Sequence, residues 1–168
     1  MTIVIGLDVH REQITYDALD TATAEVWRGR LRPATRVSLR RFLAQFADQQ
    51  VEAALEATTG WRFVVEELEA AGARVHLAEP ADTRALRGPK RRAKTDRLDA
   101  RHLRELCQQG RVPESWIPPA HIQDLRSRVR LRKALMDERV AWQQRIHAIL
   151  LHHGLPQERD LLRVSSAI

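Results

Sequence analysis

The sequence predicts an α/β fold, a mixed sheet with flanking helices, followed by a long helical arm. Three observations favour this fold. Short apolar, β-branched runs alternate with segments of helical spacing in the order β-β-β-α-β-α-β. The 168 residues suffice for one domain, which at this length buries roughly two thirds of its unfolded surface. A helical pattern then runs from about residue 120 to 153, which is too long for a helix inside an ordinary domain.

The first half of the chain predicts five strands and two helices. Residues 2–8 form an apolar run typical of a buried central strand, and the two runs that follow resemble its meander partners. Gly72 provides a stop signal after the second helix. The expected elements, in order, are strands at 2–8, 13–19 and 25–31, a helix at 37–46, a strand at 51–55, a helix at 61–71 and a strand at 74–78.

The second half predicts a loop and two further helices. Pro80, Gly88 and Pro89 mark the loop, and Thr95 or Asp96 is expected to cap a helix that ends at Gly110. The long helical pattern carries an apolar stripe without a strict heptad, which indicates a projecting or dimerising arm. We therefore predict an α/β domain at 1–112, a helical arm suited to assembly at 113–156 and the start of a further region at 157–168.

Composition excludes several classes of protein. The single cysteine, Cys107, can form neither an intrachain disulfide nor a cysteine-based zinc site, which excludes a disulfide-stapled secreted module. No stretch reaches the roughly 18 apolar residues of a membrane span, and the N-terminus lacks the pattern of a signal peptide. We expect a cytoplasmic protein that forms a globular fold.

The net charge of +6 comes from one segment. Residues 84–104 hold nine Arg and Lys against two Asp, while residues 1–60 are close to neutral. Such a segment is either a solvated loop or a surface that binds the phosphates of nucleic acid. The candidate nucleic-acid-binding residues are Arg84, Arg87, Lys90, Arg91, Arg92, Lys94, Arg97 and Arg101.

Four acidic residues stand where a sheet would bring them together. Asp8 ends the first buried strand, Glu56 follows the fourth, and Asp96 and Asp99 lie three apart at the start of a helix. Residues at i and i+3 of a helix face the same way. Four converging carboxylates repel one another unless cations are present, and Mg²⁺ prefers oxygen ligands. Two such ions support nuclease or strand-transfer chemistry.

Simpler roles exist for the same residues. Asp96 as N-cap with Asp99 three residues later would make a variant of the capping box, with no metal needed. Asp8 and Glu56 would then be ordinary polar residues at strand ends. Of the seven histidines, His102 is a candidate general base because it lies three residues after Asp99, whereas the others show no repeated ligand spacing.

Three ordered motifs resemble the N-terminal half of insertion-sequence-110 family transposases, which are related to Piv-type DNA invertases. They are IGLDVH at 5–10, LEATTG at 55–60 and KTDRLDA at 94–100, with AIL at 148–150 near the end of the long helix. The resemblance covers about residues 3–155, and its most specific part is the KTDxxDA run.

The resemblance implies a RuvC-like, ribonuclease-H-like domain with an Asp-Glu-Asp-Asp site for Mg²⁺, with Mn²⁺ able to substitute, that acts in DNA strand cleavage and exchange. Carried onto this chain, the four catalytic and metal-binding residues are Asp8, Glu56, Asp96 and Asp99. It also implies assembly into dimers or tetramers through the long helices, and in some members a bridge-type guide RNA.

Other functions share part of this sequence pattern. Proofreading exonucleases also use four acids, but their first motif is Asp-x-Glu. The corresponding tripeptide here, Asp8-Val9-His10, lacks the Glu. Sugar kinases need a glycine-rich phosphate loop that this sequence does not contain. Full-length transposases of the family carry a C-terminal domain with a catalytic serine, and we expect that domain to begin near residue 168. The alternative function is therefore an RNA- and DNA-binding and oligomerisation module that is inactive alone.

Overall fold

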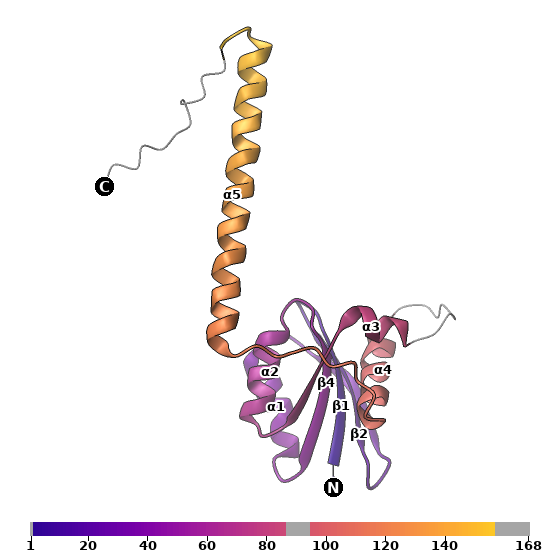
Figure 1. The fold of residues 1–168 in the computed structure, drawn as a ribbon. Helices are drawn as coiled ribbons and strands as arrows, with labels where there is room; N and C mark the ends of the chain where they lie inside the picture. The colour runs from indigo at the N-terminus through magenta and orange to yellow at the C-terminus, as the bar shows by residue number, and fades with distance from the viewer. Residues whose placement is uncertain (1, 87–94, 157–168) are drawn as a thin grey trace. The chain divides into compact units, whose positions relative to one another are not determined.

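The computed structural model describes residues 2–86 and 95–156. The chain divides into two compact units, Met1–Ile117 and Pro118–Ile168. The first unit contains a sheet with helices on both faces, and the second contains one long helix (Figure 1). Among the described residues, no helix is long and apolar enough to cross a membrane.

The first unit is built on a five-stranded sheet in the order β3-β2-β1-β4-β5. Strands β1 (Thr2–Val9), β2 (Ile14–Asp20) and β3 (Val26–Leu31) form an antiparallel meander. Strands β4 (Gln50–Glu56) and β5 (Arg74–Ala78) continue the sheet parallel to β1. This order and these directions are those of the ribonuclease-H-like fold, which confirms the predicted fold class.

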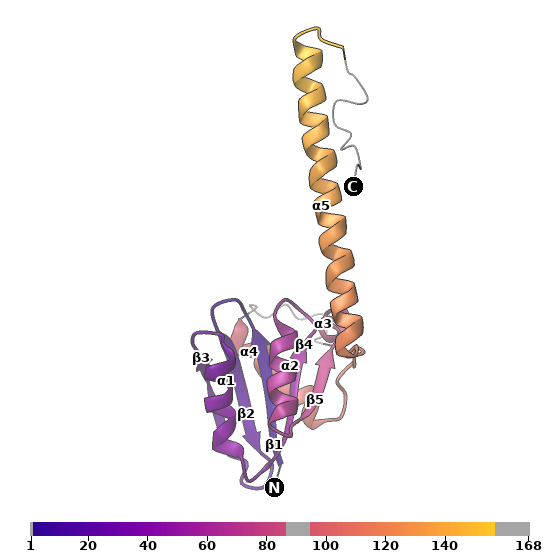
Figure 2. The same cartoon turned by 90° about the vertical axis from the view of Figure 1, so that its left-hand side faces the viewer.

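Helices cover the two faces of the sheet. Helices α1 (Arg36–Leu43, extended by the short 3₁₀ helix η1, Ala44–Phe46) and α2 (Trp61–Ala70) lie on one face, and α4 (Asp96–Gln108) lies on the other (Figures 1 and 2). These elements confirm the predicted ones to within a few residues at each end.

One short helix differs from the prediction. Helix α3 (Pro80–Ala85) occupies the start of the segment that was expected to be a loop. Proline is favoured at the first helical position because its missing N–H would have no partner there. The Thr83 hydroxyl also donates to the Glu79 carbonyl at 2.8 Å. Pro80 therefore starts a helical turn here rather than marking a loop.

Alternation along β1 assigns each residue to one face. Ile3, Ile5 and Leu7 are fully buried in the core under α1 and α2. Because successive side chains of a strand point to opposite faces, the even-numbered Gly6 and Asp8 face α4. The acidic end of β1 thus lies on the α4 face of the sheet.

Helix α4 approaches β1 closely at Gly6. A Cβ atom on Gly6 would lie 1.9 Å from the Ala100 carbonyl oxygen and 2.5 Å from the Arg104 backbone nitrogen. No other residue type fits there without moving the helix backbone. Farther along the same face, Arg104 donates from Nε to Asp17 of β2 at 2.7 Å, and both side chains are buried. These contacts fix the position of α4 over the sheet.

The second unit contains α5 (Ala120–His152), a helix of 33 residues that confirms the long helix expected at 120–153. It has no buried residue in the described structure. Large apolar side chains on it are 42–69% exposed, namely Leu125, Val129, Leu131, Leu135, Met136, Val140, Trp142, Ile149 and Leu151. Such a helix offers apolar surface that nothing in the described residues covers.

Candidate active site

Asp8 and Glu56 lie at the carboxyl ends of two neighbouring parallel strands. The β1–β4 ladder ends at the pair Leu7 and Leu55, so Asp8 and Glu56 come one step later on each strand. Both leucines belong to the core on the opposite face, which places the two acidic residues on the α4 face. The Asp8 side chain is 17% exposed.

The first turn of α4 contributes Asp96 and Asp99. Thr95 is the N-cap, because its hydroxyl accepts from the Leu98 N–H, and Asp96 is the first helical residue. The alternative with Asp96 as N-cap of a capping box is therefore wrong, and the helix does not need either carboxylate as a cap. Asp99 is buried, with 5% of its surface exposed.

Asp8, His10 and Asp96 converge. His10 Nε2 lies 2.9 Å from Asp8 Oδ2 and 3.6 Å from Asp96 Oδ1. The ligand atoms of these three residues all lie within 4.8 Å of one another. The imidazole therefore stands between carboxylates that come from the strand and from the helix.

Two consecutive hydrogen bonds, from Arg32 to Gln13 and from Gln13 to Asp96, hold the Asp96 carboxylate. Gln13 donates from Nε2 to Asp96 Oδ2 at 2.9 Å, and Arg32 donates from Nε to Gln13 Oε1 at 2.8 Å. Since the Gln13 oxygen accepts from Arg32, its amide nitrogen is directed at Asp96. These hydrogen bonds fix the carboxylate that comes from the helix.

The electrostatics of the site favour a bound cation. Burial raises the pKa of Asp8, and His10 opposes this shift through its charge and hydrogen bond. The negative charges of Asp99 and Asp96 raise the Asp8 pKa further. A cation placed among these carboxylates would relieve both the desolvation and the repulsion. The oxygen-rich donor set thus fits a hard divalent ion.

Comparison with known proteins assigns the family. The model of the DEDD transposases of the insertion-sequence-110 (IS110) type matches residues 5–154, which is most of the chain. The chain belongs to this transposase family. No curated protein matches the sequence of this transposase chain. A solved structure titled T. thermophilus RuvC in complex with Holliday junction substrate is similar over 68% of this chain and 100% of that chain, at 11% identity and a TM-score of 0.44.

The four acidic residues of the transposase chain do not all lie equally close to one another. Asp8 and Asp96 belong to the group within 4.8 Å, and Asp99 lies near enough for its charge to act on Asp8. Asp99 and Glu56 stand outside that group in the described structure. The fold thus gathers Asp8 and Asp96 directly and places Glu56 on the adjoining strand end.

His10 is a site residue that sequence reasoning missed. The sequence does not single it out, because no ligand spacing repeats among the histidines. The available signal was local, because His10 follows Asp8 by two residues at the end of a buried strand. His102, the candidate general base, lies with its Nε2 3.3 Å from the Thr83 carbonyl oxygen of α3.

The basic residues of the transposase chain divide into three groups. Arg84, Arg97 and Arg101 are exposed, and Arg101 pairs with Glu105 at 2.7 Å. Arg104, which contributes to the basic surplus of the sequence, is buried against Asp17 and is not available to bind phosphate. The remaining candidates lie outside the described residues, namely Arg87, Lys90, Arg91, Arg92 and Lys94.

Proposed function

We propose that Asp8, Glu56, Asp96 and Asp99 bind two Mg²⁺ ions and carry out DNA strand cleavage and exchange. The observation that supports this most is the approach of Asp8 and Asp96, two carboxylates from different elements, around His10. Family membership supports DNA as the substrate, because the family consists of transposases. The alternative is a nucleic-acid-binding module in which the same site is inactive on its own.

The residues present fit the metal that the family implies. The pKa of Asp8 is raised by burial and by two neighbouring carboxylates, so the site is unfavourable without a cation. Two divalent ions, when bound, stabilise the attacking and leaving oxygens of a phosphoryl transfer. The role of the chain is to hold the carboxylates in place, through the β1 strand end for Asp8 and through Gln13 for Asp96.

Thermal unfolding with and without Mg²⁺ or Mn²⁺ tests the metal site. We expect the wild type to gain about 2.7 kcal/mol at a metal concentration 100 times the Kd. Asp8→Asn and Asp96→Asn are expected to lose this gain. Asp8→Asn should also be more stable than the wild type in the absence of metal, because the buried charge and its repulsion are removed.

The matched control is Asp48→Asn, a change at an exposed carboxylate between α1 and β4. It should keep the full metal response. A wild type that gains no stability from either ion would refute the metal site and leave the nucleic-acid-binding module as the better description.

We also propose that the basic residues of the segment from Arg84 to Arg101 bind the phosphates of DNA and of a bridge-type guide RNA. The support is the positive charge of this segment, which leads directly into the first turn of α4 and hence to Asp96. Cations beside carboxylates that hold Mg²⁺ would position a phosphodiester at the metal site.

Arg91→Ala combined with Arg92→Ala tests the basic segment. We expect weaker binding to both DNA and RNA, and a slope of log affinity against log salt reduced by roughly 0.7–0.9 for each phosphate that the variant no longer neutralises. Arg74→Ala, an exposed arginine of β5, is the control and should change neither quantity. Unchanged affinity and slope in the double variant would contradict the assignment.

We propose that α5 assembles copies of this chain into a dimer or tetramer. The large exposed apolar side chains of α5 support this role, because a soluble monomer rarely exposes so many on one element. Sedimentation of the chain with and without residues 118–156 measures the effect. An assembly that persists without this segment, or a monomer in both cases, would contradict the proposal.

A further inference from the structure

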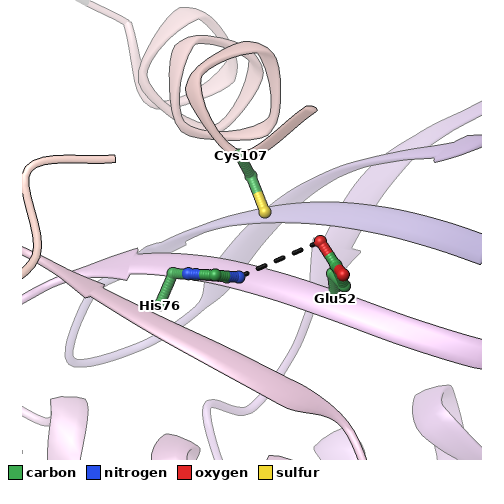
Figure 3. A group of neighbouring side chains, drawn as sticks. All are labelled: Glu52, His76 and Cys107. Carbon is green, nitrogen blue, oxygen red and sulfur yellow. Dashed lines mark ion pairs between the residues drawn. The ribbon is translucent and has the colours of Figure 1, made fainter. Parts of the chain in front are cut away.

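A second group of potential ligands lies on the α4 face, away from the acidic site. Glu52 of β4, His76 of β5 and Cys107 of α4 place their ligand atoms within 4.8 Å of one another (Figure 3). Even-numbered residues of β4 and β5 face α4, and Cys107 points down from the helix toward the space between the other two side chains. Cys107 is eleven residues after Asp96, about 16 Å along the helix axis.

His76 is oriented as metal-binding histidines are. Its Nδ1 lies 2.6 Å from the Glu114 carboxylate, which fixes the ring. Its Nε2 is buried and has no hydrogen-bond partner among the described residues. A carboxylate on one ring nitrogen that directs the other nitrogen at an ion is the usual arrangement around metal-bound histidine. A buried nitrogen without a partner otherwise costs stability.

The other two ligands can complete the site. Glu52 Oε2 lies 3.9 Å from His76 Nε2, and the exposed Arg74 approaches the other oxygen, Oε1, at 3.8 Å. Nitrogen and oxygen ligands of a tetrahedral zinc ion are about 3.4 Å apart. A small movement of the Glu52 and His76 side chains toward each other would therefore bring them to ligand distance. Burial raises the pKa of Cys107 to about 12, so the thiol keeps its proton until a metal displaces it.

We propose that Glu52, His76 and Cys107 bind a zinc ion, with Glu114 orienting His76 and a water molecule in the fourth position. A thiol and an imidazole select a softer ion than the magnesium expected at the acidic site. The cysteine count had excluded zinc sites built from cysteines, but a site with one thiolate among mixed ligands needs only Cys107. The ion would tie the last turn of α4 to β4, β5 and the Glu114 segment.

Titration of the metal-free chain with Co²⁺ under reducing conditions tests this proposal. Cobalt reports a thiolate ligand by a sulfur-to-metal charge-transfer band and a tetrahedral site by intense visible bands. We expect both sets of bands to saturate at one equivalent and to disappear when excess Zn²⁺ displaces the cobalt. Cys107→Ser is expected to abolish the charge-transfer band, and His76→Ala to abolish tetrahedral binding.

Two further variants keep the test decisive if core substitutions disturb folding. Glu114→Gln changes an exposed residue, and because it removes an outer-shell carboxylate we expect affinity to fall about 10–100-fold. Asp8→Asn, at the acidic site, should leave the cobalt spectrum and affinity unchanged. A wild type without the charge-transfer band, or a band that is as strong and as tightly saturated in Glu114→Gln, would overturn the proposal.

Discussion

Arg104→Met is expected to lower the free energy of unfolding by about 3 kcal/mol, toward the lower end of the cost of breaking a buried ion pair. Arg104 and Asp17 are 8% and 2% exposed at their side chains, and the Nε–Oδ1 distance is 2.7 Å. Methionine would leave the Asp17 carboxylate buried with one remaining ion-pair partner among the described residues, the half-exposed Arg28. Chemical denaturation of the two chains measures the difference.

A double variant distinguishes the ion pair from a simple packing effect. Asp17→Asn combined with Arg104→Met removes the buried charge, so we expect it to be more stable than Arg104→Met alone. Arg101→Met, one turn earlier on α4, removes an exposed pair with Glu105 and should cost less than about 1 kcal/mol. If Arg104→Met were as mild as Arg101→Met, the pair would not hold α4 on the sheet.

Much of the fold could be predicted because it is encoded locally. The residue spacing of β1 predicts a strand, and that of α2 predicts a helix. The predicted element ends assign Asp8 and Glu56 to strand ends, and they assign Asp96 and Asp99 to the start of a helix. The carboxyl ends of neighbouring parallel strands meet at one edge of a sheet, whatever the details of packing. Patterns within single elements were therefore enough to assign these acids to strand ends and to a helix start, and the fold brings the ligand atoms of Asp8 and Asp96 within 4.8 Å of each other.

Contacts between distant elements could not be predicted in the same way. Arg104 and Asp17 are 87 residues apart, so the charge count placed Arg104 in a basic surface when it is buried. The same limit applies to Glu52, His76 and Cys107, whose ligand atoms come within 4.8 Å of one another from three different elements, β4, β5 and α4. The helical start at Pro80 was missed for a local reason, since proline begins a helix as readily as it ends one.

Gly6→Ala is expected to weaken metal binding at the proposed site, although Gly6 has no side chain that could act as a ligand. Its new Cβ would lie 1.9 Å from the Ala100 carbonyl oxygen, a backbone atom that can move only with α4. Overpacking of this kind costs about 3 kcal/mol of stability. Because Asp96 and Asp99 are on α4 and Asp8 is on β1, the shift would also separate the carboxylates. A tenfold weaker metal affinity would reduce the Mg²⁺ stabilisation from about 2.7 to about 1.4 kcal/mol.

Leu39→Ala is the control that separates this effect from general destabilisation. Leu39 is fully buried on α1, on the opposite face of the sheet, and its truncation costs about 2–5 kcal/mol. It should nevertheless keep the full stabilisation by Mg²⁺, because α4 and β1 stay in contact at Gly6. If both variants lost the metal response equally, the response would depend on overall stability. If Gly6→Ala alone lost it, the glycine contact would set the distance between the carboxylates of the strand and those of the helix.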